Sequence, residues 1–281
     1  MAKQYHIALE RGEVGRYVLL PGDPGRCAKI AAHFDDARLV ASNREYVTYT
    51  GTLLGEKVSV TSTGIGSPST AIAVEELAAI GADTLIRVGT AGAIAPHLRG
   101  GSLVVAQGAV RDEGTTPHYV PLSYPAIADL TVVNALCQAG ERLGHEVHAG
   151  IVRSTDALYA DLAPASMPLQ ALYNDRPDAM WARANVLCAE MEAAALFVVS
   201  SIRGLRAGCV LSVVNATGEG EIPSGVPPLD RLIATAIEAL RVLIRRDISL
   251  DLLDKRAERL RVHDVSQRGL RRVAHYYIVM P

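Results

Sequence analysis

The sequence has little of several features, and each shortage excludes a class of protein. Its net charge is only −2, from 28 Lys/Arg against 30 Asp/Glu, so no excess charge favours nucleic acid or an anionic membrane as a partner. No apolar run approaches the roughly 20 residues of a membrane-spanning helix. The N-terminal stretch before Val18 contains no apolar segment of the kind found in secretory signals. We therefore expect a cytoplasmic protein that binds neither nucleic acid nor membrane.

Cysteine is also scarce. The four cysteines are far apart and form no CxxC pair, so neither a zinc site nor a disulfide framework is predicted; they are Cys27, Cys137, Cys188 and Cys209. Isolated thiols of this kind are typical of small buried side chains in a reducing compartment. Hydrophobic residues make up 49% and charged residues 21% of the 281 residues, which is the composition of a globular enzyme with a large core.

The stretch Thr84–Ile94 is the one around which the chain is organised. It reads as a buried strand that breaks at Gly89 into a loop of small residues. Arg87 interrupts the apolar run, and a buried charge needs either a carboxylate or an anionic ligand. Thr90 adds a hydroxyl, and Gly89 and Gly92 let backbone N–H groups come close to a ligand. Two interpretations stay open: a phosphate site at the end of a strand, or a structural salt bridge before an ordinary turn.

A second stretch has the pattern of an anion-binding turn. Tyr17–Pro21 predicts a short buried strand, and the glycine-rich turn Gly22–Arg26 follows it. Arg26 begins a helix expected to reach Phe34, so an arginine, backbone N–H groups and a helix N-terminus meet there. The alternative is a tight turn with a solvated arginine.

The remaining patterns predict alternating strands and helices, with no internal repeat and no linker. Tyr46–Tyr49 and Lys57–Thr63 alternate in polarity and are expected to pair as antiparallel strands. Apolar spacing predicts helices, the clearest being Pro68–Ile80, Asp129–Leu143 and Leu229–Arg246. We therefore assign one α/β domain to residues 1–246.

Two segments differ from this regular pattern. The polar loop Asp112–Pro125 is interpreted as a lid or as a contact with a partner. Residues 247–281 hold seven Lys/Arg and five Asp/Glu. Leu250, Leu253 and Leu260 would line one side of a short helix, after which order is expected to decay. We interpret residues 247–281 as a charged, solvated appendage.

Five motifs, in this order and spacing, resemble the nucleoside phosphorylase family, and within it the uridine phosphorylases. They are "LPGDPGR", "SNREYVTYTG", "STGIGSPSTAIAVEEL", "IRVGTAGAI" and "EMEAAAL", and the resemblance covers roughly residues 5–246. It implies a three-layer α/β/α sandwich around a mixed, partly closed central β-sheet. It also implies attack of inorganic phosphate, as co-substrate, on C1′ of a nucleoside. The products would be the free base and ribose 1-phosphate, and no cofactor would be required.

The resemblance also implies roles for individual residues. The positions that match the family's phosphate site are Gly22, Arg26, Arg87 and Thr90, joined by Arg44 from the neighbouring subunit. The ribose-binding positions are Met191 and Glu192 with Glu190 beside them, and His6 from the neighbouring subunit. Arg87 and Glu192 are the expected catalytic residues. Glu45, Ile65 and Ser69 match positions that hold a monovalent cation such as K⁺ between subunits in some members. The assembly would be a homo-hexamer, a trimer of dimers.

The base side departs from the family pattern. The expected base pocket comprises Leu158, Tyr159, Val213 and Val214. In uridine phosphorylases a "GQxR"-type motif that hydrogen-bonds uracil follows, but this chain has Ala160–Pro164, "ADLAP", there. Ala216 stands where uridine phosphorylases carry an arginine and related purine enzymes an aspartate nearby. Missing hydrogen-bonding groups change base discrimination strongly.

Four functions therefore remain open. The leading one is phosphorolysis of uridine or a related pyrimidine nucleoside. A phosphorylase for a purine or another base would use Asp156, Tyr159 or Asn215 for new contacts. A nucleosidase that uses water is disfavoured by the three arginines, Arg26, Arg44 and Arg87, which water does not need. A non-catalytic nucleoside-binding protein would keep the fold and lose turnover.

Overall fold

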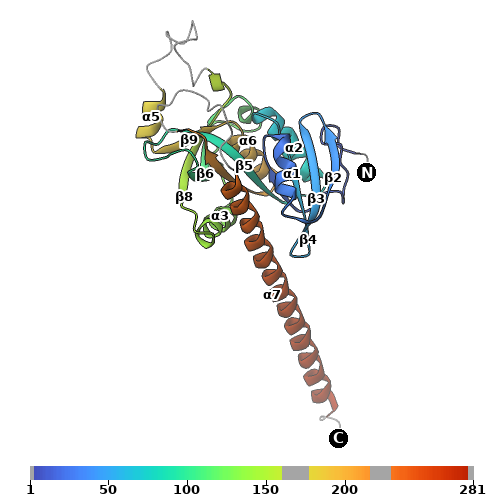
Figure 1. Ribbon diagram of the computed structural model, residues 1–281. Coiled ribbons are helices and arrows are strands. Elements are labelled where there is room, and N and C mark those ends of the chain that lie inside the picture. The colour runs from blue at the N-terminus through green and yellow to red at the C-terminus, as the bar shows by residue number, and fades with distance from the viewer. Residues whose placement is uncertain (1–2, 160–176, 216–228, 278–281) are drawn as a thin grey trace. The chain divides into compact units, whose positions relative to one another are not determined.

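The computed structural model (Figure 1) describes residues 3–159, 177–215 and 229–277, and their side chains except at 177–178 and 254–277. The segments 160–176 and 216–228, which include Ala160–Pro164 and Ala216, lie outside the described residues. Among the helices in these ranges, none is long and apolar enough to cross a membrane. The cytoplasmic location stays a prediction.

A mixed β-sheet forms the centre of the fold, as the sequence predicts. Its order is β10-β6-β8-β9-β5-β1-β4-β3-β2, and β10 also pairs with β5. Five strands therefore close on themselves, the four from β1 to β2 in this order extend as an open sheet, and the short β7 pairs with β6. The strands are β1 (Tyr17–Leu20), β2 (Asp35–Asn43), β3 (Tyr46–Leu53), β4 (Glu56–Thr61), β5 (Thr84–Ala93), β6 (Leu103–Asp112), β7 (Ala126–Ile127), β8 (Val147–Thr155), β9 (Val186–Glu190) and β10 (Arg206–Val213). This arrangement confirms the expected mixed α/β fold with a partly closed sheet.

Helices pack on this sheet, and several of the predicted site residues lie in or next to the turns at their starts. They are α1 (Pro24–Ala31), α2 (Ser67–Ala79), the short 3₁₀ helix η1 (Thr116–His118), α3 (Leu130–Arg142), α5 (Pro177–Arg183), α6 (Ala193–Ile202) and α7 (Asp230–Tyr277). Helix α1 packs on β3 and β4, α3 on β6, β8 and β10, and α6 on β5, β6, β8 and β10. Helix α6 also packs against α2.

Strand β5 is longer than the sequence predicts. The expected break at Gly89 is wrong, because β5 continues to Ala93 and Gly89 pairs with Leu211 of β10. A Cβ atom on Gly89 would lie 2.7 Å from the guanidinium carbon of Arg87. Gly89 therefore makes room for a buried arginine within a continuous strand, and this role has the same sequence signature as a turn.

The sequence predicts only β3 of the hairpin that β2 and β3 form. Strand β2 is largely exposed and polar at its start, so it lacks the apolar alternation that identifies a half-buried strand. Asn43 pairs with Tyr46, which leaves Arg44 and Glu45 as a two-residue turn. Arg44 has a φ of 53°, a left-handed conformation that is uncommon outside glycine.

The loop after β6 is held by many hydrogen bonds. Arg111 donates to the carbonyl oxygens of Pro121 at 2.7 Å, Tyr124 at 2.6 Å and Val120 at 2.9 Å. Glu113 is buried and accepts hydrogen bonds from the backbone of Thr115 and Thr116. The Arg111 bonds tie the loop to strand β6, and they would have to break for the loop to open. The structure therefore does not support the lid interpretation and leaves the partner contact as the open one.

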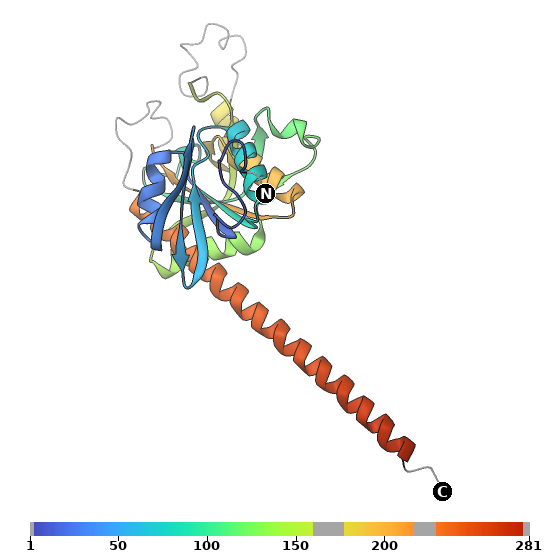
Figure 2. The same cartoon turned by 90° about the vertical axis from the view of Figure 1, so that its right-hand side faces the viewer.

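The C-terminal region departs from the expected short helix. Both views show α7 as one unbroken helix (Figures 1 and 2), and it runs from Asp230 to Tyr277 over 48 residues. The chain divides into two compact units, Met1–Arg241 and Val242–Pro281. The prediction that order decays soon after Leu260 is wrong for the backbone. The assignment of residues 1–246 as the catalytic domain stays a prediction.

Candidate functional site

Arg87 lies at the centre of a buried cluster of charges. It is only 5% exposed, and its Nε donates to Glu190 Oε2 at 2.8 Å while its Nη2 is paired with Glu192. Both carboxylates come from the junction of β9 and α6, next to β5 in the sheet. Burial opposes the charge on Arg87, but Glu192 and Glu190 outweigh burial and raise the pKa of its guanidinium. Arg87 is thus a permanent cation with two carboxylate partners, as the salt-bridge interpretation predicts.

Arg26 brings a second guanidinium to the same place. It is 6% exposed and its Nη1 donates to the carbonyl oxygen of Val88 at 2.8 Å. Its Nε is buried and has no hydrogen-bond partner among the described residues. Burial lowers the pKa of Arg26, and the positive charge of Arg87 lowers it further. A buried donor without a partner is costly, so this position is suited to an anion.

The turn at Gly22, which leads into the helix of Arg26, lies next to Arg87. A Cβ atom on Gly22 would lie 3.0 Å from the carbonyl oxygen of Gly64 and 4.0 Å from Nη1 of Arg87. The backbone can therefore approach a ligand there more closely than a residue with a side chain would allow. Asp23 caps helix α1 by accepting from Gly25 N at 2.8 Å, which fixes the turn. We call Gly22, Arg26, Arg87, Glu190 and Glu192 the Arg87 cluster.

Glu192 is held from two sides. Its Oε1 accepts a hydrogen bond from Gly66 N at 2.6 Å, and the backbone at Gly66, with φ 95°, begins helix α2. Burial raises the pKa of the Glu192 carboxyl, and Arg87 opposes that rise. Ser67 Oγ donates to the carbonyl oxygen of Met191 at 3.1 Å, so the half-buried Met191 is fixed by the same helix start. The predicted ribose-binding pair and the predicted phosphate site are thus in direct contact.

Thr90 is not joined to this cluster. It lies half-buried on β5, three residues after Arg87 and opposite Ser212 of β10. Within the part of the chain that the structure describes, no hydrogen bond links its hydroxyl to Arg26 or Arg87. Its phosphate-binding role stays a prediction.

His6 and Arg44 form a separate group of side chains. His6 Nδ1 lies 2.7 Å from Glu76 Oε1, and Asn43 donates to the carbonyl oxygen of His6 at 2.7 Å. The Tyr5 ring contacts His6 edge-on at 4.8 Å between centroids, and the Arg44 guanidinium lies 5.8 Å from the Tyr5 centroid. No contact between described residues connects these side chains to the Arg87 cluster. The two residues predicted to act together across a subunit boundary do lie together.

The three predicted cation ligands also lie near one another. Ser69 Oγ donates to the carbonyl oxygens of Ile65 and Gly66, both at 3.2 Å. A Cβ atom on Gly64 would lie 2.8 Å from Glu45 Cγ and 3.5 Å from Ser69 Oγ. A carboxylate, a carbonyl and a hydroxyl are oxygen ligands that suit a hard cation. Among the described residues, no group of three His, Cys, Asp or Glu side chains has the geometry of a metal site.

The predicted base pocket is only partly brought together. Val213 is completely buried in β10 and has no surface to offer a ligand, so its predicted role does not fit this structure. Val214 is half-buried, whereas Leu158 is 40% and Tyr159 66% exposed. Asn215 accepts a hydrogen bond from Ala93 N at 3.3 Å through Oδ1, at the end of β5.

Two residues that hold the carboxylates of the Arg87 cluster are not predicted from the sequence. Gly66 supplies the N–H that fixes Glu192, and Ser154 Oγ donates to Glu190 at 2.5 Å. Gly66 lies within a motif that identified the family, so its position was a usable signal. Ser154 is one hydroxyl in a strand of mixed polarity, and nothing in the sequence distinguishes it.

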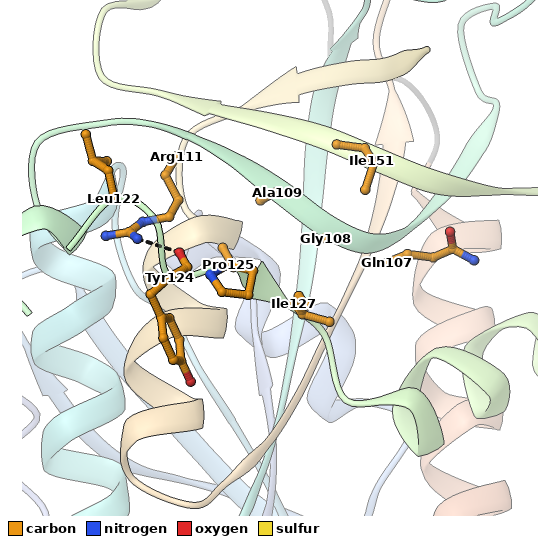
Figure 3. Close-up of a pocket in the computed structure, with 10 residues that line it drawn as sticks. Gln107, Gly108, Ala109, Arg111, Leu122, Tyr124, Pro125, Ile127 and Ile151 are labelled. Atoms are coloured by element: carbon orange, nitrogen blue, oxygen red, sulfur yellow. Dashed lines mark hydrogen bonds between the residues drawn. The ribbon is translucent and has the colours of Figure 1, made fainter. Parts of the chain in front are cut away.

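The structure also has a cavity away from the Arg87 cluster (Figure 3). It has a volume of about 530 Å³ and lies along β6, β7 and β8, lined mainly by Gly108, Arg111, Leu122, Tyr124, Ile127 and Ile151. Leu122 and Ile127 are more than half exposed. None of the predicted phosphate, ribose or base residues lines it. Its size alone therefore does not make it the candidate site, because no residue of the Arg87 cluster lines it.

Comparisons with known proteins agree on one family. A model of the phosphorylase superfamily matches residues 16–245. Uridine phosphorylase of Treponema pallidum is 47% identical over 247 residues, which cover 87% of this chain and 95% of that protein. Guanosine phosphorylase of Halorubrum lacusprofundi is 41% identical over 213 residues, which cover 76% of this chain and 83% of that protein.

A solved structure supports the same conclusion. Uridine phosphorylase from Vibrio fischeri has a TM-score of 0.73 and 36% sequence identity, and the match covers 85% of this chain and 98% of that one. The matched family region contains β1 to β10 and the whole Arg87 cluster. The family model covers most of this chain, and the 47% identity to the Treponema pallidum protein extends over 95% of that protein. The chain therefore belongs to the phosphorylase superfamily.

Proposed function

We propose that this chain is a nucleoside phosphorylase, a pentosyltransferase that splits uridine or a related pyrimidine nucleoside with inorganic phosphate. The products are the free base and ribose or deoxyribose 1-phosphate. One observation carries the proposal: two buried guanidinium groups, Arg26 and Arg87, lie beside the Gly22 turn, and Arg26 Nε has no partner in the described protein. Guanidinium groups bind phosphate through paired hydrogen bonds. The choice of uridine or a related nucleoside as the substrate rests on the similarity to uridine phosphorylases.

The chemistry follows from charge. As the bond from C1′ to the base lengthens, positive charge builds on the ribose ring, and a phosphate anion held by Arg26 and Arg87 stabilises that charge and then attacks C1′. Glu192 accepts hydrogen bonds from the ribose hydroxyls while Gly66 N–H keeps its carboxylate in place. The protein contributes positioning and electrostatics. Inorganic phosphate is the co-substrate, and the mechanism needs no cofactor.

Two alternatives have some support. A purine phosphorylase is supported by the guanosine phosphorylase relative, with Asn215 fixed at the end of β5 as the candidate base contact. A nucleoside-binding protein without turnover is supported only by the absent uracil motif. A nucleosidase remains disfavoured, because water does not need two buried guanidinium groups.

The test is cleavage of a nucleoside panel with and without phosphate. We expect cleavage to require phosphate and to yield ribose 1-phosphate. We also expect kcat/KM for uridine or thymidine to exceed that for inosine or adenosine by about tenfold or more. A uracil or thymine anion is stabilised by its two carbonyl oxygens, whereas a purine needs general-acid help of about 10²–10⁴-fold, for which no acid lies at Ala216.

The phosphate requirement and the base preference can be contradicted independently. Equal cleavage in phosphate-free buffer with free ribose as product would identify a nucleosidase. A tenfold preference for inosine or adenosine would contradict the pyrimidine assignment and leave phosphorolysis intact. Binding without turnover of any of the four would favour the binding protein.

We further propose a homo-oligomer, a hexamer built from dimers, in which His6 and Arg44 complete the site of the neighbouring subunit. Their grouping on one part of the surface, apart from the Arg87 cluster, supports this. Glu45, Ile65 and Ser69 would hold a monovalent cation such as K⁺ at the same boundary, with further oxygen ligands from the partner.

Subunit mixing tests this arrangement. Arg44→Ala and Glu192→Ala are each expected to be inactive alone, and mixing them should restore activity. In a mixed dimer, one site combines the wild-type Glu192 of one subunit with the wild-type Arg44 of the other. Arg87→Ala mixed with Glu192→Ala is the matched control and should stay inactive, because both residues belong to the same subunit's site. Persistent inactivity of the first mixture after verified subunit exchange would contradict shared sites.

A further inference from the structure

Glu190 is sealed inside the protein. Its side chain has 0% exposure, whereas the Arg87 side chain beside it keeps 6%. A carboxylate without exposed surface cannot accept hydrogen bonds from ribose hydroxyls. The ribose-binding role that the resemblance implied for Glu190 therefore does not fit this structure, and the carboxylate needs another explanation.

The hydrogen bonds of Glu190 are already complete. Besides Arg87 Nε at 2.8 Å, its carboxylate accepts from the backbone N–H of Glu192 at 2.8 Å and of Ala193 at 2.9 Å. It also accepts from Ser154 Oγ at 2.5 Å. A carboxylate offers about four lone-pair positions, and the start of a helix stabilises negative charge. The start of α6 therefore fixes Glu190, and Glu190 fixes Arg87.

Ser154 closes this network from β8. It is fully buried and lies opposite Glu190 in the parallel pairing of β8 and β9. Its hydroxyl donates to Glu190 and accepts from Ala194 N at 2.8 Å. One hydroxyl therefore joins the strand, the carboxylate and the first turn of α6.

The orientation of Arg87 follows from this network. A guanidinium is planar, so a bond that fixes the Nε–H direction also fixes the plane of Nη1 and Nη2. With Nε held by Glu190, Nη2 meets Glu192 and Nη1 faces the Gly22 turn. We infer that Glu190 and Ser154 are positioning residues, which aim Arg87 at the phosphate without touching either substrate. This inference rests on the proposed phosphate-binding role of Arg87.

Steady-state kinetics of Ser154→Ala test the inference. We expect its KM for inorganic phosphate to rise about tenfold, the size expected when a hydrogen bond to a charged group is lost, while its KM for uridine stays within about twofold. Ser154→Thr, which restores the hydroxyl, should recover most of the phosphate affinity. Ser200→Ala is the matched control: Ser200 is a fully buried hydroxyl on α6 with no partner among the described residues, and its loss should leave both KM values unchanged.

A double-mutant cycle separates positioning from general damage. If Ser154 acts through Arg87, Ser154→Ala should change phosphate affinity less than twofold in an Arg87→Lys background, since coupled residues are not additive. Calorimetric titration with inorganic phosphate gives the same comparison for variants that turn over too slowly.

Three results would overturn the inference, and they are distinct. An unchanged phosphate KM in Ser154→Ala, or parallel rises in both KM values, would reduce Ser154 and Glu190 to core packing. An undiminished Ser154→Ala effect in the Arg87→Lys background would show that Ser154 does not act through Arg87. An Arg87→Lys variant with wild-type phosphate affinity would instead remove Arg87 from the phosphate site, and with it the basis of the inference.

Discussion

Replacing Arg87 with alanine is expected to lower kcat/KM by about 10²–10³-fold, the usual loss when one preorganised donor to a charged transition state is removed. The same change should destabilise the protein, because the side chains of Glu190 and Glu192 are only 0% and 5% exposed and would lose their counter-ion. Removing one partner of a buried ion pair typically costs about 3–5 kcal/mol. Arg87→Ala should therefore lose activity and stability together.

Two measurements on the same preparation check this expectation. Denaturant unfolding gives the free energy of unfolding, and initial rates at varied phosphate and uridine give kcat/KM. Arg203→Ala is a suitable control, because Arg203 forms a bidentate pair with Glu75 at the surface. Exposed pairs contribute little, so that variant should keep wild-type activity. A folded Arg87→Ala protein with a near-wild-type rate would leave Arg87 as the centre of a structural salt bridge only.

The sequence presented Arg87 as a choice between a carboxylate partner and an anionic ligand, and the structure makes the two compatible. The partners of Arg87 could not be found from local spacing, because Glu190 lies 103 residues further along the chain. Only the pairing of β5 with β9 brings them together. What the sequence did show is that an arginine inside an apolar strand must have a partner. The family motifs then identified Glu190 and Glu192 as candidate site residues together with Arg87.

Errors in the predicted elements have identifiable physical causes. Glycine in a strand looks like a break, yet Gly89 accommodates the Arg87 side chain next to it. Strand β2 is an exposed edge strand, so its residues do not alternate in polarity. The C-terminal helix was predicted too short because its apolar spacing fades after Leu260, although the backbone stays helical to Tyr277. The first error comes from reading glycine as a breaker, and the other two come from weak apolar periodicity.

The base side was the least predictable part of the site. The family pattern gave positions for the pocket, but Val213 proved fully buried and Leu158 and Tyr159 exposed. The backbone N–H that holds Glu192, by contrast, comes from the turn at Gly66, which lies inside one of the family motifs. A base contact depends on one side chain at one position, and a motif that lacks it gives no substitute.

Arg26→Met should separate the anion site from the salt bridge. This change removes a guanidinium whose pKa is lowered by burial and by Arg87, and keeps an apolar side chain of similar length. In phosphate-free buffer the variant loses its bond to the Val88 carbonyl and also loses a like-charge repulsion. Its free energy of unfolding should therefore stay within about 1–2 kcal/mol of wild type, in contrast to Arg87→Ala.

With phosphate present, the difference between wild type and Arg26→Met should become large. A ligand at 100 times its dissociation constant stabilises the native state by about 2.7 kcal/mol, so phosphate should raise the unfolding free energy of wild type by that amount. The variant should need about 10–10²-fold more phosphate for the same gain, since each hydrogen bond to a charged group contributes about 1.5–3 kcal/mol. Arg153→Met is the control, because Arg153 is equally buried but pairs with Asp112. It should keep the phosphate response. If Arg26→Met responds to phosphate as wild type does, Arg26 holds the Val88 carbonyl and does not bind the anion.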